Sequence, residues 1–147
     1  MRFALLGNVP DDVLTRFHGH TVVVTDHPND ASVAERAVEA KMTVVRQAAA
    51  WQTMDHPLSQ QATRMNDQGD TTTYNRNGGY VRDACLPEHV DGIIIGSGLS
   101  ARRLQILREA AETADVPIRY VVPPKTERHE VELVLSSLGF EDAEPPY

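Results

Sequence analysis

Cysteine and long hydrophobic runs are both scarce in this chain. The single cysteine, Cys85, cannot form an internal disulfide among the 147 residues. We therefore expect a reducing, cytoplasmic setting. The longest apolar runs span about five residues, whereas a membrane-crossing helix needs roughly 20. The sequence thus predicts neither a membrane association nor a signal peptide.

Basic residues are fewer than acidic ones, and aromatic residues are also few. The formal net charge is −7 at pH 7, and aromatic residues make up 5% of the chain. Proteins that hold nucleic acid by its phosphates are usually basic, and single-strand binders stack bases on aromatic rings. We therefore expect no nucleic-acid partner, although local arginine clusters are compatible with a small anionic ligand.

Short apolar runs alternate with amphipathic segments along most of the chain. The runs at 3–6, 21–24, 42–45, 93–95 and 118–122 have strand length and are rich in β-branched residues. Helical patterns follow them, including one capped by Ser32, one running from Ser100 to about Ala114, and a last one near 131–138. This alternation predicts one α/β domain over 1–147, a Rossmann-like three-layer sandwich. Its mostly parallel five-stranded sheet should have order 3-2-1-4-5, with helices on both faces.

A polar segment at about 53–77 interrupts the alternation. It is rich in Gln, Asn, Asp and Thr and shows no sustained period. We expect an insertion without regular structure, which could serve as a lid, as an arm between subunits of a homo-oligomer, or only as a surface loop. The acidic, proline-rich stretch at about 141–147 is expected to fray.

A glycine-rich turn follows the most apolar run, in Ile95-Gly96-Ser97-Gly98. A buried strand, a tight turn and a helix N-terminus together can bind an anion through backbone N–H groups. A plain β–α connection needs glycine for the same tightness, so both interpretations stay open. The predicted strand order places this turn beside the first strand's turn, where ligands of open sheets bind. The ligand-binding candidates at this corner are Gly7, Asn8, Gly96, Ser97, Gly98 and Ser100.

Three segments occur in the order and spacing of a known family. They are Ala49-Ala50-Trp51, then Gly78-Gly79-Tyr80-Val81-Arg82-Asp83, then the strand led by Asp91 with its glycine turn. Over roughly 21–122 the chain resembles the SLOG superfamily of Rossmann-like nucleotide-binding proteins, in particular its YspA/YpsA-related group. The resemblance implies binding of a nucleotide or nucleotide-derived signal. Two departures are Asp83, where the family has Asn, and Asp26-His27-Pro28-Asn29 in place of a glycine-rich turn.

Side chains near these segments form the rest of the predicted site. Arg82 is expected to clamp a phosphate, and Asp83 either orients Arg82 or accepts a ribose hydroxyl. Trp51 or Tyr80 would lie over a base, although such rings also pack under loops. A cation in the first turn of a helix opposes the helix dipole, and a bound anion would relieve this. One of the two arginines in that turn, Arg102 or Arg103, is therefore expected to face the ligand, and Arg102 is chosen. The remaining candidates are Asp26 for ribose hydroxyls, and Gly79.

Turnover of the ligand is the main alternative to binding. A nucleoside or nucleotide N-glycosidic hydrolase, or a deoxyribosyltransferase-like enzyme, needs a carboxylate at the reacting centre. Asp26 and Asp83 are the first candidates, followed by Asp30 and Asp91. The family's enzymes carry a glutamate on the helix after the glycine turn, whereas this helix has no carboxylate before Glu109.

This omission favours sensing or sequestration of a signalling nucleotide over catalysis. A second alternative is an oligomeric protein-interaction module that uses the segment at 53–77. The sequence predicts no cofactor. It also predicts no metal site, because His18 and His20 fall at the opposite end of their strand from Asp26 and His27.

Overall fold

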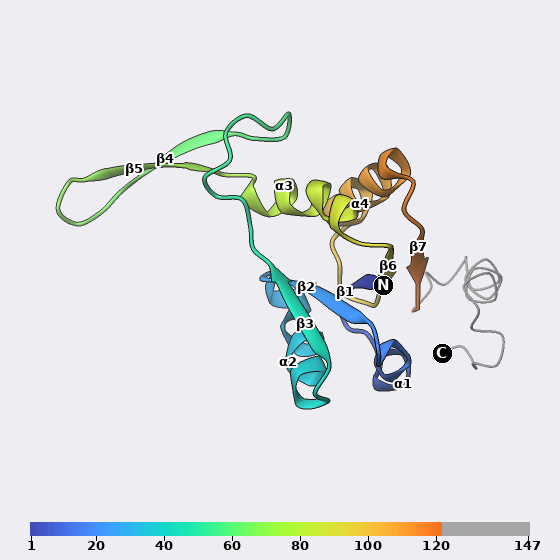
Figure 1. Cartoon of the computed structure of the whole chain (residues 1–147). Helices are drawn as coiled ribbons and strands as arrows, with labels where there is room; N and C mark the ends of the chain where they lie inside the picture. The colour runs from blue at the N-terminus through green and yellow to red at the C-terminus, as the bar shows by residue number, and fades with distance from the viewer. Residues whose placement is uncertain (122–147) are drawn as a thin grey trace.

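The computed structural model describes residues 1–121. Within them, five parallel strands form one sheet in the order β3-β2-β1-β6-β7 (Figure 1). Counted along the chain, this is the predicted order 3-2-1-4-5, so the Rossmann-like α/β architecture is confirmed. The predictions of a last helix near 131–138 and of a frayed stretch at 141–147 lie outside the described residues. The strands are β1 (Arg2–Leu6), β2 (Thr21–Thr25), β3 (Thr43–Gln47), β6 (Gly92–Ile95) and β7 (Ile118–Tyr120).

Helices cover the sheet on both faces (Figure 1). The central strands are buried on both sides, so successive residues enter different cores. Leu5 and Ile94 belong to one core, whereas Leu6 and Ile95 belong to the other. The first core is closed by α1 (Asp11–Leu14), η1 (Thr15–Phe17) and α2 (Ala31–Glu39), and the second by η3 (Leu86–His89) and α4 (Ala101–Ala114), with α3 (Gly78–Cys85) packed against α4. No helix in residues 1–121 is long and apolar enough to cross a membrane.

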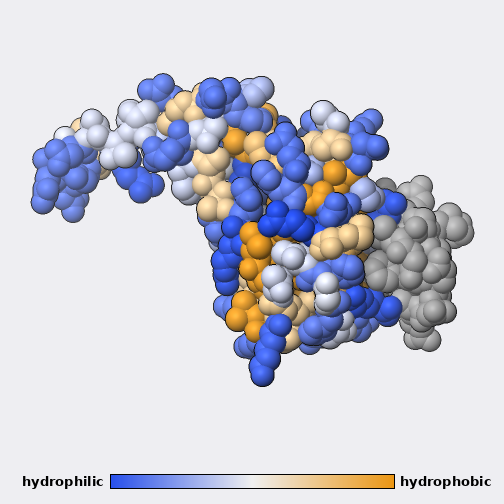
Figure 2. Space-filling view, in the orientation of Figure 1, coloured by the Kyte–Doolittle hydropathy of each residue, from blue (hydrophilic) through white to orange (hydrophobic). Residues whose placement is uncertain are grey.

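The segment at 53–77 has regular structure, contrary to the expectation from the sequence. It contains an antiparallel hairpin of β4 (Gln61–Met65) and β5 (Thr71–Asn75). The Asn66 side chain accepts the N–H groups of Gln68 and Asp70, and Gly69 has a φ of 84°, so the turn has its own chemistry. The hairpin extends away from the sheet (Figure 1), and its outer end is polar (Figure 2).

Helix starts were predicted with mixed success. The Ser100 hydroxyl oxygen accepts the Arg103 N–H at 3.2 Å, and α4 ends at Ala114, as expected. The prediction of Ser32 as an N-cap was wrong. The short helix η2 (Pro28–Asp30) leads directly into α2, so Ser32 lies inside the first turn, where its hydroxyl accepts from Arg36.

Candidate functional site

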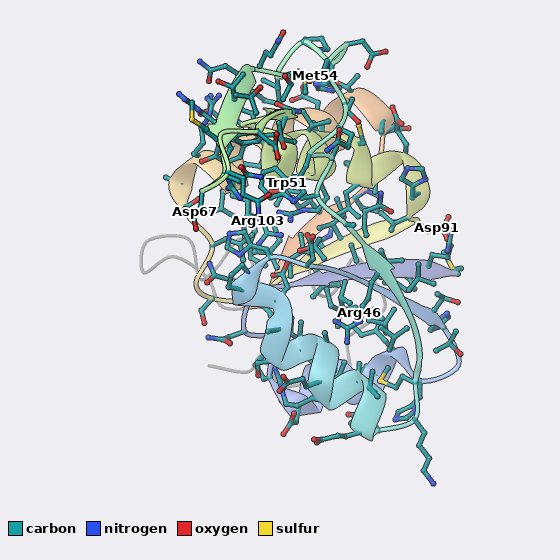
Figure 3. The ribbon with its side chains drawn as sticks, turned by 90° about the vertical axis from the view of Figure 1, so that its left-hand side faces the viewer. Arg46, Trp51, Met54, Asp67, Asp91 and Arg103 are labelled. Atoms are coloured by element: carbon teal, nitrogen blue, oxygen red, sulfur yellow. The ribbon has the colours of Figure 1, made fainter. Side chains whose placement is uncertain are left out.

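A cavity of about 260 Å³ opens at the carboxyl edge of the sheet. In Figure 3, Trp51 and Arg103 lie close together on this side, whereas Asp91 lies at the opposite end of the strands. Four separate segments contribute to the cavity: the turn after β2, the loop after β3, the start of α3 and the start of α4. Its lining residues are His27, Trp51, Arg76, Asn77, Gly79, Tyr80, Arg82, Asp83, Ser100 and Arg103.

A chain of ion pairs lies behind this lining. Arg103 is 1% exposed, and its guanidinium contacts Asp30 at 2.6 Å and Asp83 at 2.8 Å. The other oxygen of Asp83 contacts Arg82 at 3.1 Å, and Arg82 reaches Asp26 at 2.6 Å. We call these five side chains the ion-pair network. Because buried charges are costly without partners, the network fixes both arginines in place.

Groups at three strand ends, two backbone N–H groups and one hydroxyl, donate to the same network. Asp30 accepts the Gly7 N–H at 2.6 Å and the Thr25 hydroxyl. Asp26 accepts the Ala49 N–H with both carboxylate oxygens, at 3.0 and 3.1 Å. The network therefore joins the ends of β1 and β2 and the loop after β3 to α3 and α4, and this places the cavity walls relative to one another.

The network also sets protonation states. Burial alone would raise the pKa of Asp26, but the Ala49 N–H and the Arg82 guanidinium lower it overall, so this carboxylate is ionised at neutral pH. Burial would lower the pKa of Arg103, but its hydrogen bond to Asp30 and the charge of Asp83 raise it overall. Both groups therefore stay charged at neutral pH.

His27 is a basic side chain of the wall that is mainly neutral at pH 7. Burial and the nearby positive charge of Arg103 lower the pKa of His27. Its Nδ1 accepts the Asn29 N–H at 3.0 Å, so the hydrogen of the neutral ring sits on Nε2. His27 can therefore offer a neutral donor at the cavity wall without adding charge.

Trp51 and Tyr80 supply aromatic surface to the cavity, in keeping with their selection from the sequence. Trp51 is 48% exposed and rests on Gly78, where a Cβ would approach Cε3 of the indole to 2.5 Å. Tyr80 carries the Arg102 guanidinium 5.6 Å from its ring centroid. Arg102 itself is exposed and does not line the cavity. The neighbouring Arg103 lines it instead.

The glycine turns at the ends of β1 and β6 are pressed against each other. The Asn8 N–H donates to the Ser97 carbonyl at 2.8 Å, and the Gly96 N–H donates to Leu6 at 2.8 Å. A Cβ on Gly96 would overlap the Asn8 carbonyl group, and one on Gly7 would lie 2.5 Å from the Ser97 oxygen. These glycines allow close backbone packing, and the N–H groups of Gly7, Asn8 and Gly96 are already engaged.

The predicted crevice between the two turns is therefore closed. Gly98 lies outside this contact, since its carbonyl accepts from the Asn29 side chain at 2.8 Å and a Cβ on it would meet no atom closer than 4.0 Å. Of this corner, only Ser100 lines the 260 Å³ cavity. The candidates that lie outside the lining are Gly7, Asn8, Gly96, Ser97 and Gly98.

The four carboxylate candidates are separated by their surroundings. Asp91 accepts the Arg2 N–H at the amino end of the sheet, far from the cavity (Figure 3). Asp30 and Asp83 are at most 1% exposed and are bonded through both oxygens. Asp26 has a 43% exposed side chain but does not line the 260 Å³ cavity. Among residues 1–121, no group of three or more His, Cys, Asp or Glu side chains could hold a metal ion.

The sequence reasoning did not predict the part that several residues play in the site. Arg103 lies four and eight residues before Leu107 and Ala111, on the same buried stripe of α4, and this spacing was readable. Asp30, by contrast, meets Gly7 and Arg103 only after the chain folds. The further lining residues that were not proposed are His27, Arg76 and Asn77.

Comparison with known proteins gives little further guidance. No family model matches the sequence, and no curated protein matches it either. Among solved structures, the chain is similar to a carbohydrate kinase from Agrobacterium tumefaciens, with 11% identity and a TM-score of 0.43. The match covers 91% of this chain and 57% of the kinase, and a similarity this low supports no argument about activity.

Proposed function

We propose that this protein binds a nucleotide or nucleotide-derived anion in the 260 Å³ cavity, to sense or sequester it. The observation that carries the proposal is the meeting of two aromatic side chains, Trp51 and Tyr80, with the Arg82 guanidinium in one small space. An aromatic ring stacks on a base, and a guanidinium pairs with phosphate oxygens. The SLOG resemblance points to the same ligand class, because its central segment begins α3 at this cavity.

Arg82 can contact such an anion through one nitrogen. Its Nε and Nη1 are held by Asp83 and Asp26. Its Nη2 lies beside Gly79, at 3.6 Å from the place of a Cβ there, and has no hydrogen-bond partner among the described residues. Ser100 accepts the Arg103 N–H and still has its own hydroxyl hydrogen to donate. The cavity thus combines a fixed cation with neutral donors.

Binding is favoured over turnover by the state of the carboxylates. Glycosidic cleavage needs one group that stabilises the sugar cation and another that assists the leaving base. Asp83 is sealed between two arginines, and Asp26 is held ionised, so neither supplies the required acid. N-glycosidic hydrolysis remains the alternative proposal, with Asp26 as the carboxylate nearest to solvent.

The direct test is calorimetric titration with AMP, GMP and their diphosphates, alongside native mass spectrometry for a co-purified anion. Substituting Trp51→Ala should weaken nucleotide binding about 5- to 150-fold, because stacking on one base is worth roughly 1–3 kcal/mol. Trp51→Phe should retain most of the affinity. Arg46→Ala, an exposed change on β3, serves as the control.

Two results would overturn the proposal. Absence of binding by every nucleotide, with no co-purified anion, removes the ligand class. Release of free base during incubation, detected by chromatography, replaces the binder with the enzyme.

A further inference from the structure

A second cavity of about 420 Å³ lies beneath one face of the hairpin. The pairing of Ala62 with Tyr74 and of Arg64 with Thr72 places these side chains on the same face. Three of them line the cavity, and Trp51 and Arg76 complete it. Its lining is Trp51, Arg64, Thr72, Tyr74 and Arg76.

Trp51 and Arg76 line both cavities, so the two spaces are neighbours that share a wall. One side of the indole is covered by Gly78, and the ring is otherwise half-exposed. Arg76 is exposed, and its guanidinium has no acidic partner among residues 1–121. Within the described residues, a cation without an ion pair therefore lies in the wall that the two cavities share.

The chemistry of the second cavity repeats that of the first. Tyr74 supplies a ring with the Arg64 guanidinium 5.5 Å from its centroid. The lining contains no carboxylate, although the whole chain has a net charge of −7. Aromatic surface and positive charge together are suited to a second base and its phosphate.

The volumes of the two cavities also favour a ligand that occupies both. Small-molecule sites usually enclose about 300–1,000 Å³, and the first cavity, at 260 Å³, falls just below this range. The adjoining cavity of 420 Å³ falls within this range, and so does the combined volume of the two cavities.

We infer that the ligand spans both cavities and is a dinucleotide-like molecule, with two planar heterocycles joined by an anionic bridge. This inference rests on the proposed function. One base lies between Trp51 and Tyr80, and the other lies against Tyr74 under the hairpin. Arg76 faces the bridging phosphates.

The test compares AMP with P1,P2-diadenosine diphosphate by calorimetry on the full chain. The dinucleotide should bind at least tenfold more tightly than AMP. Tyr74→Ala should abolish that gain and leave the AMP affinity unchanged, whereas Tyr74→Phe should keep it. Thr63→Ala, on the opposite face of the hairpin, is the matched control and should change neither affinity. Circular dichroism of each variant verifies that the hairpin change leaves the fold intact.

The possible outcomes distinguish failure of this inference from failure of the proposed function on which it rests. If AMP binds and the dinucleotide gains nothing, the spanning ligand is wrong while the proposed function stands. If Tyr74→Ala weakens AMP and the dinucleotide equally, the hairpin acts on the first cavity only and the second is not a subsite. If neither nucleotide binds, both proposals fall.

Discussion

Two corners of the same sheet edge are built in opposite ways. Where β1 meets β6, glycines let two turns touch, and backbone hydrogen bonds close the space between them. A short way along the edge, charged side chains from α3 and α4 are paired with each other behind the lining of an open cavity. A glycine-rich turn at a topological switch point is therefore not sufficient evidence for a ligand site, because tight packing needs the same residue.

The largest expected change in stability comes from the ion-pair network beside the cavity. Replacing Arg103→Met removes the cation between Asp30 and Asp83, both at most 1% exposed. Two buried carboxylates are then left without it, and breaking a buried pair costs about 3–5 kcal/mol. Urea denaturation should show this loss in the free energy of unfolding.

Arg102→Met is the matched control, because it is the neighbouring arginine and is exposed. It should cost less than about 1 kcal/mol, the scale of its contact with Tyr80. Equal losses for the two variants would show that the ion-pair network does not hold the cavity.

A smaller change in stability is expected at the contact between the turns after β1 and β6. Gly96→Ala places a Cβ against Asn8 and within 2.7 Å of the Val9 nitrogen, so the two turns must separate. Overpacking of this kind costs about 1–3 kcal/mol. Gly79→Ala meets only the Arg82 side chain, at 3.6 Å or beyond, and should be neutral or stabilising by up to about 1 kcal/mol. Thermal unfolding of both variants sharpens the contrast, and a tolerated Gly96→Ala would show that the turns are not closed.

The smallest effect concerns pH. His27 has a lowered pKa in the fold, so between its folded pKa and its ordinary value of 6.5 the unfolded chain binds more protons. The stability linked to His27 is therefore fully present above pH 6.5 and declines as pH falls below it. His27→Asn keeps an acceptor for the Asn29 N–H but does not titrate.

Melting temperatures of the wild type and of His27→Asn at pH 7.5 and 5.5 measure this difference, since the other histidines are common to both. The wild type should lose more stability on acidification. Identical losses would mean that His27 is not held neutral in the cavity wall.

The sheet could be predicted from the sequence because its signals are local and periodic. Unbroken β-branched runs, turns between them and the Ser100 cap were enough to give the strand order and the bounds of α4. The hairpin was missed because its strands are mainly polar and exposed, so they lack an apolar alternation. Its turn chemistry, with Asn66 and Gly69, was the available signal.

The candidate site was predicted only in part, and the reason is physical. Trp51, Tyr80, Arg82 and Asp83 were selected from local motifs, and the fold brings them to one cavity. Long-range pairs cannot be read in this way. Asp30 meets Arg103 across 73 residues of chain, and no local pattern indicates that pairing.

The most direct test of the account is a nuclear magnetic resonance titration of the ¹⁵N-labelled protein with AMP. Trp51 is the only tryptophan, so its indole N–H gives a single resonance. We predict saturable shifts of that resonance and of the Asn77, Gly79 and Tyr80 amides, with Gly7 and Gly96 unmoved. Shifts confined to Gly7 and Gly96, with Trp51 unaffected, would place the ligand at the turn described here as closed and contradict the central claim.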